Sequence, residues 1–181
     1  SIIVRTQVGG RASDDFYYNL NGQQVQCSGG YYGTHREFNT EGQNTSLTFL
    51  DKDGHAVSTS SGYAIKTYQR DRNGTVVGEQ YFDTEGNSAR SSLGQYGELY
   101  QRNEQGYIGQ ITYLGADGKP TPTNAGYTIL KRTYHRDGTA DTDMYFDANG
   151  NPKALSKGQY GIKRSGKVNL LLDRNSNVML C

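Results

Sequence analysis

Residues 63–94 read YAIKTYQRDRNGTVVGEQYFDTEGNSARSSLG, and this stretch contains the unit from which the chain is built. Glycine closes three segments of the unit at Gly74, Gly86 and Gly94, so that the unit divides into 12, 12 and 8 residues. Glycines recur at these positions every 32 residues. A repeat of about 20–50 residues is typical of solenoids and other arrays, so the period alone predicts a repeat architecture.

The period divides the whole chain into copies of this unit. Complete copies occupy residues 31–62, 63–94, 95–126 and 127–158, with a partial copy at 1–30 and a shortened copy at 159–181. In the shortened copy, Ser176 stands where the other copies have a glycine. Degenerate terminal copies are typical of a capped array. We therefore expect one repeat array over residues 1–181.

Each unit contains two stretches with the composition of β-strands. Residues 63–70 and 76–82 are rich in aromatic and β-branched side chains. Between them, Asn73-Gly74 favours the positive φ of a hairpin turn. Sustained helical spacing is missing, and glycine recurs too often for helices. The sequence predicts an all-β, open solenoid of stacked β-hairpins. A propeller is the alternative, but it needs about four strands per blade and each unit has only two or three.

A pair of large side chains ends four residues before the second glycine of every unit. The first members are Tyr17, Phe49, Tyr81, Tyr113 and Tyr145, and the second members are Tyr18, Leu50, Phe82, Leu114 and Phe146. Because neighbouring residues of a strand point to opposite faces, the pairs form two rows. The second row is the more apolar and is predicted to be core, whereas the hydroxyl groups of the first row suit a wet surface. We expect the first row to form an outward aromatic ladder for sugar rings. In the alternative, both faces are covered and every ring is core.

The pair and its following turn resemble a known repeat. Tyr81-Phe82-Asp83-Thr84-Glu85-Gly86 and Tyr145-Phe146-Asp147-Ala148-Asn149-Gly150 are similar to hairpins of bacterial cell-wall-binding repeats, the choline-binding and glucan-binding modules of surface proteins. Tyr17-Tyr18-Asn19-Leu20-Asn21-Gly22 is similar as well. This resemblance implies an extracellular or cell-surface β-hairpin solenoid of bacteria that holds glycans against aromatic rings. The unit also resembles the Tyr-Asp repeats of large bacterial surface and toxin proteins, where it serves as scaffold. The chain departs from the cell-wall-binding family in having no tryptophan and a longer repeat.

Catalytic and metal chemistry are not indicated by the sequence. His35, His55 and His135 occupy different positions in their units, and no nucleophile elbow or phosphate-binding glycine cluster is present. Asp51–Gly54 and Asp147–Gly150 resemble the opening of calcium loops but lack the closing ligands. Turn chemistry explains these residues, because Asp accepts backbone hydrogen bonds there. We expect a protein that is not an enzyme and has no metal or cofactor.

Charge and apolar patterning limit the partners. The net charge is only +1, so nucleic acid is not expected as a partner, although basic residues gather at Lys131, Arg132, Arg136, Lys163, Arg164 and Lys167. No stretch is apolar enough for a membrane span. Cys27 and Cys181 form no disulfide framework and are expected to be free thiols. Exposed sheet edges at the ends of an array make self-association an expected property.

These observations favour a non-catalytic module that binds glycans or cell-wall polymers. The alternative is a structural spacer or a scaffold for protein association without a small ligand. The chain begins inside a repeat, so we expect it to be a fragment or a processed region of a larger protein.

Overall fold

The computed structural model describes residues 2–179. Within these residues it contains twelve β-strands and no helix, which confirms the predicted all-β class and the stacked hairpins. The chain divides into two compact units, Ser1–Ser92 and Leu93–Cys181, which are described separately. Cys27 is half-buried and forms no disulfide, whereas Cys181 lies outside the described residues.

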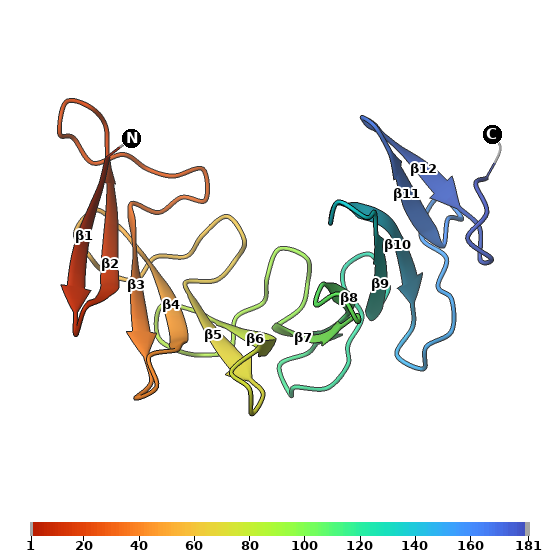
Figure 1. Ribbon diagram of the computed structural model, residues 1–181, viewed down its shortest axis with the longest axis horizontal. Coiled ribbons are helices and arrows are strands. Elements are labelled where there is room, and N and C mark those ends of the chain that lie inside the picture. The colour runs from red at the N-terminus through yellow and green to blue at the C-terminus, as the bar shows by residue number, and fades with distance from the viewer. Residues whose placement is uncertain (1, 180–181) are drawn as a thin grey trace. The chain divides into compact units, whose positions relative to one another are not determined.

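The first unit is an antiparallel meander in which each strand pairs with the next one in the chain (Figure 1). Its strands are β1 (Ile2–Val8), β2 (Arg11–Tyr18), β3 (Gly33–Phe38), β4 (Asn44–Leu50), β5 (Ile65–Arg70) and β6 (Val76–Phe82). Pairing is long within a hairpin and short between hairpins. In β3–β4 the register runs from Gly33↔Leu50 to Phe38↔Asn44, but β4 meets β5 only from Ser46↔Thr67 to Thr48↔Ile65. The strands of neighbouring hairpins therefore diverge toward their turns.

The second unit repeats this pattern in β7 to β12. Its strands are β7 (Gly97–Arg102), β8 (Ile108–Leu114), β9 (Ile129–Tyr134), β10 (Ala140–Phe146), β11 (Gly161–Ser165) and β12 (Val168–Leu172). Among the residues that the structure describes, β1 does not pair with β6 and β7 does not pair with β12. Neither meander therefore closes into a barrel, as the open solenoid requires.

The hairpin turns need glycine for two reasons. Gly42 closes the β3–β4 turn by donating its N–H to the Asn39 carbonyl at 2.9 Å, with φ at +79°. This is the left-handed region, which side chains other than glycine rarely adopt. A Cβ on Gly42 would also collide with the guanidinium of Arg11, and one on Gly138 would lie 2.7 Å from the Tyr107 hydroxyl. At these two turns, the residue that follows the glycine of the preceding hairpin turn therefore packs over the next turn.

A connector of fourteen residues follows each complete internal hairpin, such as 51–64 in the first unit. It opens with the predicted turn: the Asp51 carboxylate accepts the backbone N–H groups of Asp53 and His55, each at 2.9 Å. Asp83 and Asp147 make the corresponding bonds in their own connectors. The acidic residues of these turns therefore perform the structural role that turn chemistry predicts.

Successive connectors are joined to one another by backbone hydrogen bonds. In the first unit, Ser60 N–H donates to Gly29 O and Ser92 N–H donates to Ser61 O, both at 2.8 Å. A Cβ on Gly62 would lie only 2.8 Å from the Arg90 carbonyl oxygen, so this contact requires glycine. The connectors form a second layer alongside the sheet, which the sequence pattern did not predict.

Candidate functional site

The first row of large side chains, proposed from the sequence as a ligand surface, lies beneath the connectors. In the first unit, Tyr31 of one connector lies between the rings of Tyr17 and Phe49, with centroid distances of 6.2 and 4.8 Å. Tyr63 of the next connector lies between Phe49 and Tyr81, at 6.0 and 4.4 Å. Each connector ring thus joins two consecutive hairpins.

The second unit is built in the same way around a small core. Tyr127 of the connector contacts Tyr113 at 5.5 Å and Tyr145 at 4.7 Å between centroids. Tyr113, Leu130 and Tyr145 form a buried cluster, against which Ile111 and Leu155 pack. The contact between hairpins is therefore made by aromatic rings in both units.

This arrangement corrects the expected orientation of the first row. Tyr81, Tyr113 and Tyr145 retain only 5%, 4% and 9% of their exposure, so the expectation that they face outward is wrong. Tyr17 and Phe49 are half-buried. The reason is that the connector folds back over this face and needs large rings to fill the space. In the second row, Leu50 and Leu114 are buried, whereas Tyr18, Phe82 and Phe146 are half-buried. The alternative in which every ring is core therefore does not hold throughout either.

Burial also sets the chemistry of the tyrosine hydroxyl groups. Desolvation raises the pKa of Tyr113, Tyr127 and Tyr145, because the charged phenolate would lose its hydration. These residues therefore remain protonated around neutral pH. Their rings pack as neutral groups against one another.

A buried charge cluster occurs in the first unit. Asp15 is 3% exposed and accepts hydrogen bonds from Arg5 Nε at 2.6 Å and from Arg36 Nη1 at 2.9 Å. The hydrogen bond from Arg5 contributes most to a lowered pKa of Asp15, against the opposing effect of burial. Because one carboxylate faces two guanidinium groups, this cluster has a net positive charge.

The second unit contains the equivalent cluster, four periods of 32 residues further on. Asp143 is 3% exposed and lies 2.6 Å from both Arg132 and Arg164. Burial raises the pKa of Asp143, but its hydrogen bonds to the two arginines outweigh this effect and lower it. Two members of the basic group seen in the sequence are therefore tied to an internal acid. Neither cluster is predicted from the sequence, although the spacing of Asp15 and Asp143 by four periods is a signal that could have indicated them.

The histidines do not share a site. His35 lies 2.7 Å from Asp14, and His135 lies 3.5 Å from Asp141. His55 lies 3.6 Å from Asp51 in an exposed turn. Across residues 2–179, no three His, Cys, Asp or Glu side chains are grouped so that they could hold a metal ion.

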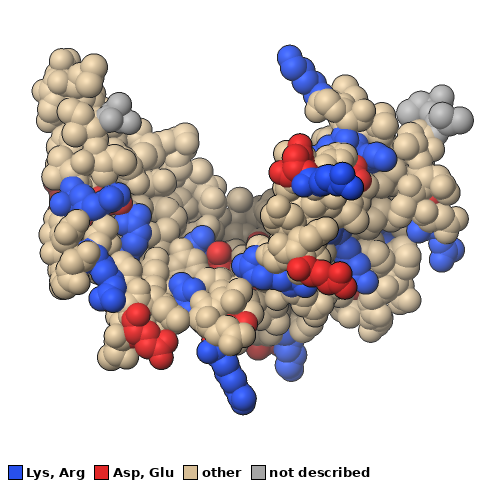
Figure 2. All heavy atoms as spheres, in the orientation of Figure 1, with Lys and Arg blue, Asp and Glu red and all other residues tan. Residues whose placement is uncertain are grey.

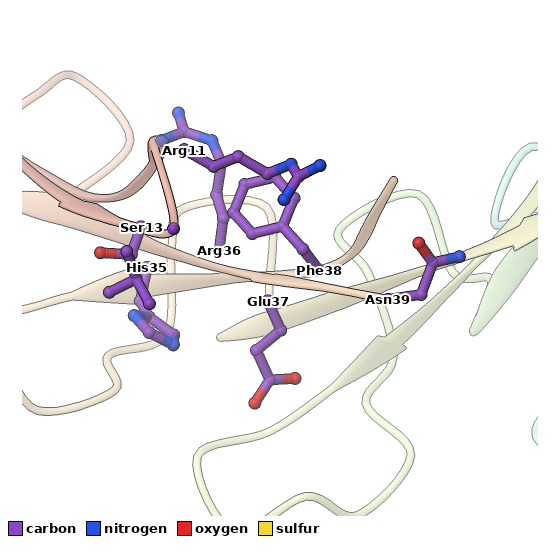
Figure 3. Close-up of a pocket in the computed structure, with 9 residues that line it drawn as sticks. Arg11, Ser13, His35, Arg36, Glu37, Phe38 and Asn39 are labelled. Atoms are coloured by element: carbon purple, nitrogen blue, oxygen red, sulfur yellow. The ribbon is translucent and has the colours of Figure 1, made fainter. Parts of the chain in front are cut away.

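The first unit contains a cavity of about 360 Å³ where the tips of β2 and β3 diverge. It is lined by the β1–β2 turn, by Arg11 and Ser13 of β2, and by residues 35–39. Figure 3 shows Arg11, Arg36 and Phe38 on one side of these strands, with His35 and Glu37 on the other. This alternation follows from the strand geometry of residues 35–38.

Comparisons with protein-family models and with the curated proteins found no match. The visible surface has scattered charges of both signs between larger uncharged areas (Figure 2). In the part of the chain that the structure describes, no helix has the length and apolar character needed to cross a membrane.

Proposed function

We propose that this chain is a non-catalytic structural array that serves as a spacer or as a scaffold for protein association. The observation that carries this proposal is the use of the repeated aromatic rings between hairpins. Tyr31 and Tyr63 in the first unit, and Tyr127 in the second, bridge consecutive hairpins and leave the first row largely enclosed. Repeats of this type make extended surfaces rather than one catalytic pocket.

Glycan or cell-wall-polymer binding is a second proposal, with a smaller site than the sequence pattern indicates. One observation favours it: Tyr17, Tyr31 and Phe49 are consecutive rings of the first unit and each remains partly exposed. Aromatic rings with polar tips can present a face to a sugar while they pack through the other face. An extracellular or bacterial surface location belongs to the same proposal.

A glycan array that includes cell-wall polysaccharides and choline-bearing polymers separates the two proposals. The scaffold proposal expects no signal above that of a reference protein. The glycan proposal expects saturable binding that Tyr17→Ala weakens and Tyr107→Ala, in the second unit, leaves unchanged. Binding with that pattern would overturn the purely structural role.

A further inference from the structure

At two of the four junctions between neighbouring hairpins described within the units, a polar side chain at the turn end donates a hydrogen bond to a backbone carbonyl of the adjacent hairpin. At β4–β5, Arg70 Nη2 donates to the carbonyl oxygen of Asn44 at 2.8 Å. At β8–β9, the Tyr134 hydroxyl donates to the carbonyl oxygen of Ile108 at 2.8 Å. Donors and acceptors at the two junctions occupy equivalent places in the repeat. A polar side chain at the end of the later strand therefore bridges the gap.

Among the described residues, the turn end of the β2–β3 junction has no such bridge to a backbone carbonyl, although Arg36 and His35 bind Asp15 and Asp14 further along the strands. Phe38 occupies the place of Arg70 and Tyr134, and Ala12 occupies the place of the two accepting residues. A phenyl ring has no hydrogen-bond donor, so it cannot bind the Ala12 carbonyl. The cavity of about 360 Å³ lies at this junction.

The charges around this cavity favour an anion. Among the residues that the structure describes, Arg11 forms no ion pair, while Arg36 shares Asp15 with Arg5. The guanidinium groups of Arg11 and Arg36 lie on the same side as Phe38 (Figure 3). Glu37, the acidic residue in the lining, points to the opposite side and accepts a hydrogen bond from Ser46 at 2.7 Å.

We infer that this cavity binds a small anion through a carboxylate or phosphate group held by Arg11 and Arg36. The guanidinium fork matches both groups, which can accept two parallel hydrogen bonds. Phe38 provides an apolar wall for the body of the ligand, as in many small-molecule pockets. This binding function goes beyond the proposed scaffold and does not depend on it.

Isothermal titration of the protein at low ionic strength with sodium glucuronate, inorganic phosphate and glucose tests the inference. At least one anion binds saturably and glucose does not, and the tighter anion identifies the preferred group. Arg11→Gln weakens binding of that anion by about tenfold or more. Arg72→Gln removes the same charge from an exposed position of the β5–β6 turn, and it changes the affinity by less than about twofold.

A second variant tests the cavity itself. Phe38→Tyr reproduces the bridge that Tyr134 makes, so it closes the gap to Ala12 without adding charge. It abolishes anion binding, while the unfolding temperature is unchanged or higher. The inference is overturned if neither anion binds saturably or if Arg72→Gln weakens binding as much as Arg11→Gln. It is also overturned if a folded Phe38→Tyr protein binds like the unmodified chain. Should Phe38→Tyr fail to fold, the two arginine variants decide the question.

Discussion

The two ends of each hairpin are stabilised by different interactions. Where the strands run into the connector, rings such as Tyr63 and Tyr81 stack at 4.4 Å beneath a second layer of chain. At the turn end, polar side chains such as Arg70 and Tyr134 join neighbouring hairpins through hydrogen bonds to backbone carbonyls, and the Tyr134 ring also contacts Tyr107 at 4.8 Å between centroids. The enclosed ring contacts at the connector end are stabilised by burial of apolar area. A single hydrogen bond at the turn end contributes much less, so its polar side chain can be replaced by another residue. The β2–β3 junction shows the consequence, because its bridge is replaced by Phe38 and a cavity appears.

The largest expected effect comes from truncating a ring at the connector end. Tyr113→Ala removes a side chain that is 4% exposed from the core of the second unit, and it should lower the free energy of unfolding by about 3–5 kcal/mol. Tyr107→Ala, near the turn end of the same unit, removes a ring that is 39% exposed and should cost only about 1 kcal/mol. Urea unfolding of both variants measures the difference. Equal losses would show that the two ends do not differ as described.

The buried charge cluster of the second unit should give the next effect. Asp143→Asn leaves Arg132 and Arg164 facing a neutral amide and should cost about 2–4 kcal/mol, reduced from the fully buried case because both guanidiniums are partly exposed. Asp117→Asn, at an exposed turn with a contact of 3.7 Å to Lys119, should cost less than about 0.5 kcal/mol. Chemical unfolding at neutral pH provides both values. A loss at Asp143 as small as that at Asp117 would mean that the cluster contributes no stability.

Alanine substitutions at two glycines of the first unit distinguish the cost of backbone strain from the cost of a steric contact. Gly62 and Gly86 have φ values of +91° and +84°, so alanine is strained at both. Only at Gly62 would the added Cβ meet backbone, the Arg90 carbonyl oxygen at 2.8 Å. Gly86→Ala should cost about 1 kcal/mol and Gly62→Ala about 2–3 kcal/mol. Thermal unfolding of the pair checks the order, and the reverse order would contradict the stacking of connectors.

The smallest effect concerns the turn carboxylates and pH. The backbone N–H of Asn87 lowers the pKa of Asp83 below its ordinary value of 3.8. Because the folded pKa is the lower one, this stabilisation is present above about pH 4 and is lost as the pH falls through the folded pKa. Asp83→Asn should keep the turn, as Asn19 does, and make the fall of unfolding free energy with acid less steep. Urea unfolding at a series of acidic pH values compares the slopes of the two proteins, and equal slopes would contradict this role of Asp83.

The sequence predicts the rows of large side chains but not which of them are exposed. Strand alternation correctly divides Tyr81 and Phe82 between two faces, but it does not say which face a connector covers. The hydroxyl group of Tyr81 favours an exposed position, yet the ring is buried because Tyr63 stacks on it. The charge clusters were missed for a similar reason. Arg36 and Asp15 belong to different hairpins, and only the register of β2 with β3 brings them together.

The hairpins, their period and their turns follow from local properties of the amino-acid sequence: β-branched and aromatic strands, Asn-Gly turns, and glycines such as Gly42 at positive φ. Three other features become visible only in the folded chain: the row of rings that is enclosed, the charges that share Asp15 and Asp143, and the cavity beside Phe38. Those features depend on contacts between residues of different repeats. The repeat shows which residues occupy the same position in different units. The distance between such residues depends on how the connectors and hairpins pack.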